Sequence, residues 1–287
     1  LDGGTGTEIA RLGGKVDSVT WSSLANITDP ELIKKIHKNY IKSGVDIITT
    51  NTFSSCRHVL DGSGNGKDFI EINKLAVQHA KEARQSFSNS KEIIIAGSIS
   101  NTLALKKGLG YPDPEYIPSI KNEKKNYRDM ANILADEGVD VFFLEMMLDE
   151  EHSFRLLEIV KEIGLPVCVG LSCSETLENK IVGFDIEIER KFSLDKNYIK
   201  TKNSSLNDII NKLKVLSPDV FGIMHTNIHT TNKALKILKE EWNGKLMVYP
   251  EIIRYDYDSE EYISYLSPYE FSKECKSWLN QGISIIG

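Results

Sequence analysis

The chain has 287 residues, of which 40% are hydrophobic and 26% charged, a composition typical of a soluble globular protein with one large domain or two ordinary ones. Its net charge is −6 and no basic run is interleaved with aromatic residues, which argues against a nucleic-acid or membrane-surface partner. No apolar stretch approaches the ~20 residues needed to cross a bilayer. The four cysteines form no CxxC pair and no dense framework, so we expect reduced thiols and a cytoplasmic protein.

The chain opens on a glycine-rich turn, which an amphipathic helix follows. Leu1–Glu8 reads Leu-Asp-Gly-Gly-Thr-Gly-Thr-Glu, and we interpret it as a strand end that runs into a turn whose glycines let a ligand approach the backbone. It is not a GxGxxG pattern, so it gives little support to a dinucleotide site. Further on, Thr28-Asp29-Pro30-Glu31 predicts a capping box at the start of a helix that ends at Gly44.

Apolar runs then alternate with helical stripes to the end of the chain. The clearest run, Gly138–Met146, is nearly unbroken and carries Glu145 near its end, as expected for a parallel strand buried on both faces. With the strand end at Leu1 we count eight strands, the others being predicted at 45–48, 93–98, 138–146, 167–172, 220–224, 245–250 and 283–286. The charged, irregular stretch Glu178–Lys202 is predicted to be a surface excursion.

Two folds fit this strict alternation of strands and helices: an open doubly wound sheet and a closed barrel. Eight strand–helix units in roughly 250 residues or more favour the α/β class with a (β/α)8 TIM barrel, which also explains why polar residues collect at one end of every strand. We therefore predict a single barrel domain over residues 1–287. Both ends of the sequence are abrupt, so we expect a longer natural chain, with the first strand and the last strand and helix incomplete here.

In such a barrel the polar residues at the strand ends form a ring around one mouth. The expected members of this ring are Asp2, Asn51, Ser98, Glu145, Ser172, His225 and Tyr249. The carboxylates of Asp2 and Glu145 suit the ammonium group of a ligand, which forms charge-assisted hydrogen bonds with them. The alternative for Glu145 is a side chain that is exposed to solvent or paired with a nearby lysine.

The histidine and serines of the ring allow fewer conclusions. His225 is a candidate general base or metal ligand, and His229, four residues on, pairs with it only if the loop between them is helical. Ser98 and Ser172 lack the elbow motif that presents a nucleophilic serine, so the sequence does not support a hydrolase triad.

Several segments resemble the homocysteine S-methyltransferase family, and they follow one another in the family's order along the whole chain. They are Asp2-Gly-Gly-Thr-Gly-Thr-Glu8, Trp21-Ser22, His37-x-x-Tyr40, Gly44-Val-Asp-Ile-Ile-Thr-Thr-Asn-Thr-Phe53, Gly97-Ser-Ile99, Gly138–Glu145, Tyr249-Pro250 and Gly282–Gly287. The opening turn and the Thr-Asn-Thr-Phe strand end are the most specific of these segments.

The resemblance implies a (β/α)8 barrel enzyme that transfers a methyl group to the sulfur of L-homocysteine, giving methionine. It also implies Zn²⁺ held by three cysteines, because coordination converts a thiol of pKa about 8.5 into the nucleophilic thiolate. By the same resemblance, Asp2, Gly3 and Glu145 hold the ammonium and backbone portion of the amino acid, with Thr52 and Ser98 as secondary contacts. The implied partners are small molecules: the thiol and a donor such as S-methylmethionine, S-adenosylmethionine or betaine.

The chain departs from the family pattern at the metal. His225 stands where the first zinc cysteine is usual. The Gly-Gly-Cys-Cys run that carries the other two cysteines would begin at Gly287, where this sequence stops. Asn101 also replaces a usual proline, and Glu251 a usual asparagine.

Two explanations fit this departure. In the first, His225 completes a His/Cys₂ zinc site with two cysteines that lie after Gly287, and both ligand types suit Zn²⁺. In the second, the protein is a degenerate, non-catalytic relative that binds a small amino-acid ligand without zinc. We favour the first, because the acids expected to bind the ammonium group remain in place.

Overall fold

The computed structural model describes residues 1–87, 92–107, 111–185, 188, 203–256 and 261–287. These residues belong to two compact units. The first is made chiefly of Leu1–Glu145 and Arg155–Val167, and the second of Met146–Phe154, Cys168–Asp195 and Thr201–Gly287. Most of the surface excursion predicted for Glu178–Lys202 lies outside the described residues. Among the residues that are described, no helix is both long and apolar enough to cross a membrane.

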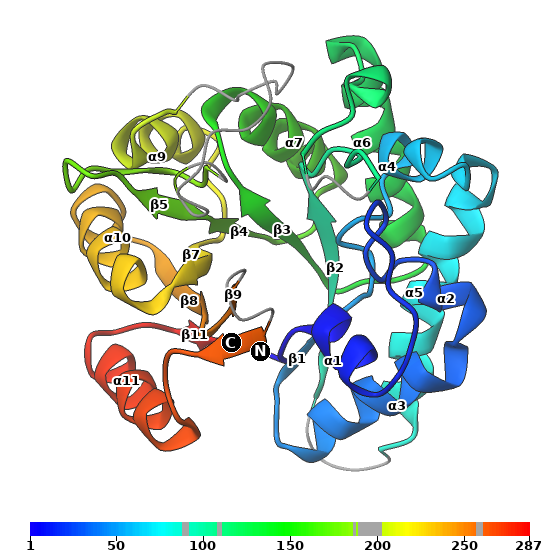
Figure 1. The fold of residues 1–287 in the computed structure, drawn as a ribbon, viewed down its shortest axis with the longest axis horizontal. Helices are drawn as coiled ribbons and strands as arrows, with labels where there is room; N and C mark the ends of the chain where they lie inside the picture. The colour runs from blue at the N-terminus through cyan, green and yellow to red at the C-terminus, as the bar shows by residue number, and fades with distance from the viewer. Residues whose placement is uncertain (88–91, 108–110, 186–187, 189–202, 257–260) are drawn as a thin grey trace. The chain divides into compact units, whose positions relative to one another are not determined.

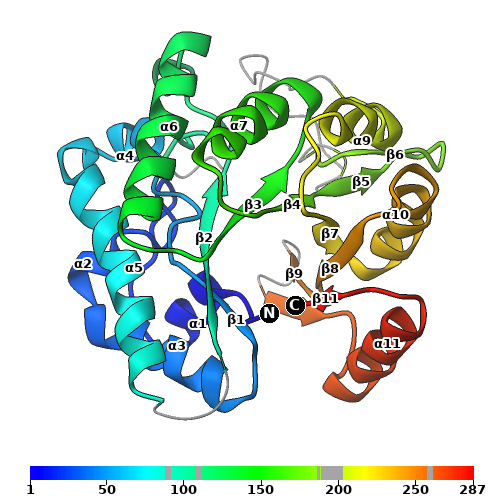
Figure 2. The same ribbon diagram turned by 180° about the vertical axis from the view of Figure 1, so that it is seen from behind.

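The first unit is built on a parallel sheet with helices packed against it (Figure 1). Strands β1 (Ile47–Thr49), β2 (Ile94–Ser100) and β3 (Val141–Met147) pair in that order, with Thr49 opposite Ala96 and Ser100 opposite Glu145. Its helices are α1 (Thr5–Arg11), α2 (Ala25–Thr28), α3 (Pro30–Lys42), α4 (Arg57–Gly62), α5 (Phe69–Gln85), α6 (Ile120–Asp136) and most of α7 (Glu150–Ile163), with short 3-10 turns at Gly66–Asp68 and Pro114–Tyr116. Figure 2 shows α5 and α6 side by side over this sheet.

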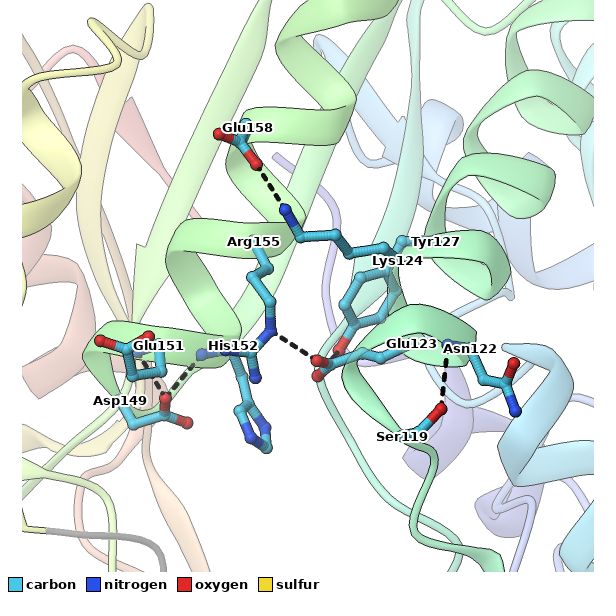
Figure 3. Close-up of polar contacts among 10 residues, drawn as sticks. All are labelled: Ser119, Asn122, Glu123, Lys124, Tyr127, Asp149, Glu151, His152, Arg155 and Glu158. Carbon is cyan, nitrogen blue, oxygen red and sulfur yellow. Dashed lines mark hydrogen bonds and ion pairs between the residues drawn. The ribbon is translucent and has the colours of Figure 1, made fainter.

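A buried ion pair joins α6 to α7 within the first unit (Figure 3). The Nε of Arg155 donates to Oε2 of Glu123 at 2.6 Å, and the hydroxyl of Tyr127 donates to the other carboxylate oxygen at 3.1 Å. Only 3% of the Glu123 side chain and 12% of the Arg155 side chain are exposed. Because both carboxylate oxygens are hydrogen-bonded, the buried charge is compensated and the two helices are fixed to one another.

The strands of the second unit that follow β3 in the sheet order are parallel as well. Strands β4 (Val167–Leu171), β7 (Val220–Asn227), β8 (Lys245–Glu251) and β11 (Ile285–Ile286) pair in that order. The other elements are helices α9 (Leu206–Lys214), α10 (Ile228–Glu241) and α11 (Pro268–Asn280), and two antiparallel hairpins, β5 (Cys173–Glu175) with β6 (Ile181–Gly183) and β9 (Ile253–Asp256) with β10 (Glu261–Ser264). Helix α10 packs against β7 and β8.

The predicted alternation of parallel strands and helices is confirmed within each unit. All seven strands predicted after the strand end at Leu1 are present, with ends that shift by a few residues. The predicted strand end at Leu1 amounts to one backbone bond, in which the N–H of Asp2 donates to the carbonyl of Ile47 at 2.9 Å. The glycines that follow turn the chain into α1 before a second such bond forms. Closure into a barrel and the single domain stay predictions.

The predicted capping box at Thr28 is wrong. Thr28 is the last residue of α2, a short helix that the sequence pattern did not indicate, and Asp29 is the N-cap of α3. The side chain of Asp29 makes no capping bond and instead accepts a hydrogen bond from the Thr28 hydroxyl at 2.6 Å. A capping box does form at Ser267 and Glu270, where α11 begins.

A buried histidine makes the first unit sensitive to acid. His37 on α3 is fully buried, and neither ring nitrogen has a hydrogen-bond partner among the described residues. Burial, and to a smaller extent the charge of nearby His79, lowers the pKa of His37 from an ordinary value of 6.5 to about 4. As the pH falls, His37 is therefore protonated near pH 6.5 in the unfolded chain but only near pH 4 in the folded protein.

We expect the free energy of unfolding to fall by about 3 kcal/mol as the pH drops from 6.5 to 4, through this one group. The substitution His37→Leu should remove that part of the pH dependence, measured by urea unfolding of the full chain at several pH values. His229→Leu, at an exposed position, is the control. A His37→Leu curve parallel to that of the parent would contradict the assignment.

Candidate functional site

Strand β2 has one face toward the helices and one face away from them. A Cβ placed on Gly97 would lie 3.1 Å from Val139 Cγ2 and 3.4 Å from Leu134 Cδ1 of α6, so Gly97 faces the helical layer. Alternate residues of a strand point to opposite faces, and residues opposite one another in neighbouring strands share a face. Ser98 and Ser100 therefore face away from α6, together with Glu145 on β3.

Asp2 reaches this same face beside β1. One carboxylate oxygen accepts the backbone N–H of Thr49 at 2.7 Å, and the other accepts its hydroxyl at 2.8 Å. Only 1% of Asp2 is exposed. Burial raises the pKa of Asp2 to about 7; the two bonds from Thr49 oppose this shift, and the carboxylate of Glu145 adds to it. The structure thus brings together the two acids that the sequence predicted as partners.

Glu145 is buried, with 8% of the residue exposed, so the solvent-exposed alternative for it is wrong. It is the last residue of β3 in register with β2, and the residue after it, Met146, has a left-handed backbone with φ of +52°. Because the carboxylate of Glu145 adds to the raised pKa of Asp2, a positive group near both acids would favour the ionised form of Asp2.

The glycine-rich turn packs tightly against two aromatic side chains. A Cβ on Gly3 would lie 3.0 Å from the Tyr40 hydroxyl, and one on Gly6 would lie 1.9 Å from Trp21 Nε1. The hydroxyl of Tyr40 also donates to the carbonyl of Gly4 at 3.4 Å. The sequence suggested that these glycines let a ligand approach the backbone. In the structure, Gly6 instead leaves room for the side chain of Trp21.

Hydroxyl groups fasten the end of β1 to the end of β2. Thr52 donates to the carbonyl of Ser98 at 2.7 Å, and its Oγ1 lies 2.7 Å from that of Thr50, which accepts the N–H of Ser98 at 3.1 Å. Ser100 donates to the carbonyl of Phe53 at 2.7 Å. The hydroxyl of Thr52 is therefore used to bind the backbone of β2. Ser98 Oγ is fully buried and has no hydrogen-bond partner among the described residues, unlike the hydroxyls of Thr50, Thr52 and Ser100.

The side chains of two further members of the predicted ring form hydrogen bonds within the protein. Asn51 exchanges hydrogen bonds with Ser22, whose hydroxyl donates to Asn51 Oδ1 at 2.7 Å, and Ser172 donates to the carbonyl of Met224 at 2.9 Å. The sequence analysis missed Thr49, the residue that holds the carboxylate of Asp2. The run of four polar residues that begins at Thr49 was the available signal.

His225 lies in the second unit at an irregular strand end. The register of β7 against β8 shifts between Met224 and Asn227, and His225 within this shift has φ of +42°. Its ring stacks on that of Tyr249 on β8, with 6.2 Å between centroids and 26° between planes. Strand β7 continues to Asn227, so the segment that leads to His229 is not helical and the pairing of the two histidines is not supported.

The part of the chain that the structure describes holds no group of three His, Cys, Asp or Glu side chains placed to bind a metal ion. All four cysteines are free thiols. Burial raises the pKa of Cys56 and of Cys168 to about 12, and this keeps both protonated at neutral pH. A catalytic zinc site needs three protein ligands. The described residues therefore do not supply a full zinc ligand set by themselves.

Comparisons with known proteins agree along the whole chain. The family model described as homocysteine S-methyltransferase matches residues 1–287. Homocysteine S-methyltransferase 3 of Zea mays is 22% identical over 302 residues, covering 100% of this chain and 84% of that protein. Selenocysteine methyltransferase of Astragalus bisulcatus is 24% identical over 315 residues, covering 100% and 86%. The metallated form of the homocysteine methyltransferase MmuM from Escherichia coli matches with a TM-score of 0.72 at 19% identity, covering 100% and 89%, so the fold is shared.

The raised pKa of Asp2 predicts how stability depends on pH. The folded protein keeps the proton on Asp2 up to about pH 7, whereas the unfolded chain loses it near 3.8, so this group destabilises the fold as the pH rises between these values. Asp2→Asn removes this cost. We expect its unfolding free energy, relative to the parent, to improve by roughly 2–3 kcal/mol from pH 5 to pH 8. Urea unfolding at both values is the measurement, and an unchanged difference would contradict the assignment.

Proposed function

Because the chain belongs to the homocysteine S-methyltransferase family, we propose that it transfers a methyl group from a donor such as S-methylmethionine, S-adenosylmethionine or betaine to the sulfur of L-homocysteine, giving methionine. Membership of this family makes the protein an enzyme that transfers a methyl group to a thiol. The observation that carries the choice of substrate is the buried pair of carboxylates, Asp2 and Glu145.

The two acids fit the ammonium end of an amino acid. An ammonium group offers three N–H donors and a full positive charge, and both carboxylates gain charge-assisted hydrogen bonds from it. Such a ligand favours the ionised form of Asp2, whose proton leaves when the ligand binds. Gly3 belongs to the turn beside Asp2, and we assign its backbone to the amino-acid portion of the ligand.

The hydroxyls at the strand ends have different roles in this proposal. Ser98 contacts the ligand through the hydroxyl that has no partner in the described residues, and Thr52 holds the backbone of Ser98 in place. Burial of the pair keeps water from competing for the ammonium group, which strengthens each of these interactions. In this arrangement the amino-acid end is fixed, and the sulfur is the part of the ligand that remains to react.

Zinc is the proposed cofactor, although its ligands are not all among the described residues. We assign His225 as one ligand and expect two thiolates from residues that follow Gly287. A family neighbour has been solved in a metallated form, which supports a metal in this fold. When bound, zinc would supply a thiolate at neutral pH from the substrate thiol. The non-catalytic alternative gains no support from the comparisons, and the cytoplasmic location stays a prediction.

The role of Glu145 is tested by removing its charge. Glu145→Gln keeps the shape of the side chain but loses the ionic part of a buried hydrogen bond, so we expect the KM for L-homocysteine to rise about tenfold or more. Steady-state kinetics of the full chain with S-methylmethionine as donor is the measurement. Glu71→Gln, an exposed acid on α5, is the matched control for a change in net charge. An unaltered KM for Glu145→Gln would remove Glu145 from the substrate site.

The metal assignment is tested by elemental analysis of the full-length protein. We expect about one zinc per chain, and none if the protein is the non-catalytic scaffold. His225→Ala should abolish zinc retention, because a three-ligand site that loses one ligand binds the metal far more weakly. His229→Ala is the control. Zinc content that is the same in His225→Ala and in the parent would exclude His225 from the ligand set.

A further inference from the structure

The chain changes direction at Met146 through a conformation that L-amino acids rarely adopt. Its φ of +52° lies in the left-handed region, and Met146 is part of β3, which continues to Met147. Two other described residues with such values lie in ordinary turns: Asn179 between the strands of the β5–β6 hairpin, and Ser217 just after α9. A left-handed residue inside a strand needs another explanation than a turn.

Hydrogen bonds hold the backbone on both sides of Met146. Before it, Glu145 pairs with Ser100 of β2 and closes the register of the two strands. After it, the carbonyl of Met147 accepts the N–H of Ser172 at 3.1 Å. Asp149 then caps the start of α7, where one carboxylate oxygen accepts the N–H groups of Glu151 at 2.9 Å and His152 at 2.8 Å (Figure 3). Met146 therefore lies directly between a residue held in the β2–β3 register and residues held by the hydrogen bonds of Met147 and Asp149.

This arrangement makes the direction of Glu145 depend on the backbone of Met146. A residue at 146 that cannot adopt a left-handed φ must break the bonds of Met147 and Asp149 or rotate the peptide that follows Glu145. Glu145 is the last residue of β3 in register with β2, so a rotation of the peptide that follows it strains the end of this pairing and reaches the side chain through a shift of the Glu145 Cα. Residues held in uncommon backbone regions persist only where their surroundings enforce them, and they cluster at functional sites.

We propose that Met146 is a positioning residue: its left-handed backbone holds the carboxylate of Glu145 on the buried face where the ammonium group of the amino-acid substrate binds. This role rests on the function proposed above. It acts through φ at position 146 and not through the methionine side chain. A purely structural account, in which Met146 only leads the chain into α7, predicts a loss of stability with no specific effect on the substrate.

The test compares substitutions at 146 that differ in their tolerance of a left-handed φ. Met146→Gly and Met146→Asn adopt this region readily, whereas the branched Cβ of Met146→Val excludes it. We expect the valine variant to raise the KM for L-homocysteine and its Kd, measured by calorimetry, at least tenfold, with kcat within about twofold of the parent. The glycine and asparagine variants should keep both constants within about threefold. Met146→Thr, which has the same branched Cβ, replaces the valine variant if that one does not fold.

Ser217→Val is the matched control, because it places the same branched residue at a left-handed position far along the chain from Glu145. It should lower the melting temperature and leave the KM at the parental value. In a Glu145→Gln background, Met146→Val should have no further effect on the KM, since the carboxylate it positions is gone.

The outcomes separate the positioning role from the proposed function. A parental KM for Met146→Val, or an effect that adds fully to that of Glu145→Gln, overturns the positioning role alone, provided that Glu145→Gln by itself raises the KM. If Glu145→Gln leaves the KM unchanged, both the substrate assignment and the positioning role are overturned. A KM raised equally by valine, glycine and asparagine shows that the methionine side chain acts directly, and this also overturns a backbone role.

Discussion

The burial of the Asp2 carboxylate, close to a second buried acid, Glu145, is the constraint on which the first unit depends. Asp2 and Glu145 are both removed from water, and each ionised acid loses hydration that the protein must replace. The pKa of about 7 for Asp2 shows that the replacement is incomplete, even with two hydrogen bonds from Thr49. A cationic group between the acids relieves this cost. Under the function proposed above, the same burial that weakens the fold supplies part of the free energy with which the ammonium group binds, a trade between stability and function.

Contacts around Asp2 and Glu145 hold the two acids in place although their burial destabilises the fold. The hydroxyls of Thr50, Thr52 and Ser100 join the end of β1 to the end of β2 through backbone atoms, so the two strand ends move as one. Trp21 and Tyr40 press on the glycines of the opening turn and fix the segment that carries Asp2. Because these contacts are made to the backbone or to glycine, the positions of the acids follow from the path of the chain and not from flexible side chains.

The sequence predicted what depends on periodicity and on residue type. Gly138–Met146 is apolar on both faces, so its strand follows from the pattern. The pattern left open whether Glu145 at its end is buried or exposed, and the structure buries it. The proximity of Asp2 and Glu145 follows from placing polar residues at the same end of the parallel strands, although β2 lies between β1 and β3. The capping box failed for a local reason: the same four residues can end one helix or start the next. Whether Thr28 ends α2 or caps α3 depends on how these helices pack, and the local sequence does not specify this packing.

The sequence could not predict the left-handed backbone positions or the hydrogen-bond partners of the hydroxyls, for a physical reason. A threonine at a strand end binds either a ligand or a carbonyl, and Thr52 differs from Ser98 only in what the fold brings near it. In the same way, methionine has no sequence signal for a left-handed φ, because the surroundings and not the residue impose it.

His225 shows the same principle in the second unit. Its left-handed φ lies inside the register shift of β7, and its ring stacks on Tyr249, so both the backbone and the plane of the imidazole are fixed before any ligand arrives. A histidine held in this way presents its nitrogens in a set direction, and a ring that is oriented by a neighbour loses less conformational entropy on binding. At Met146 and at His225 an uncommon backbone thus stands at or beside the end of a strand that carries a polar side chain. Residues held in such backbone regions persist only where their surroundings enforce them, so at both strand ends the surroundings outweigh the preference of the residue itself.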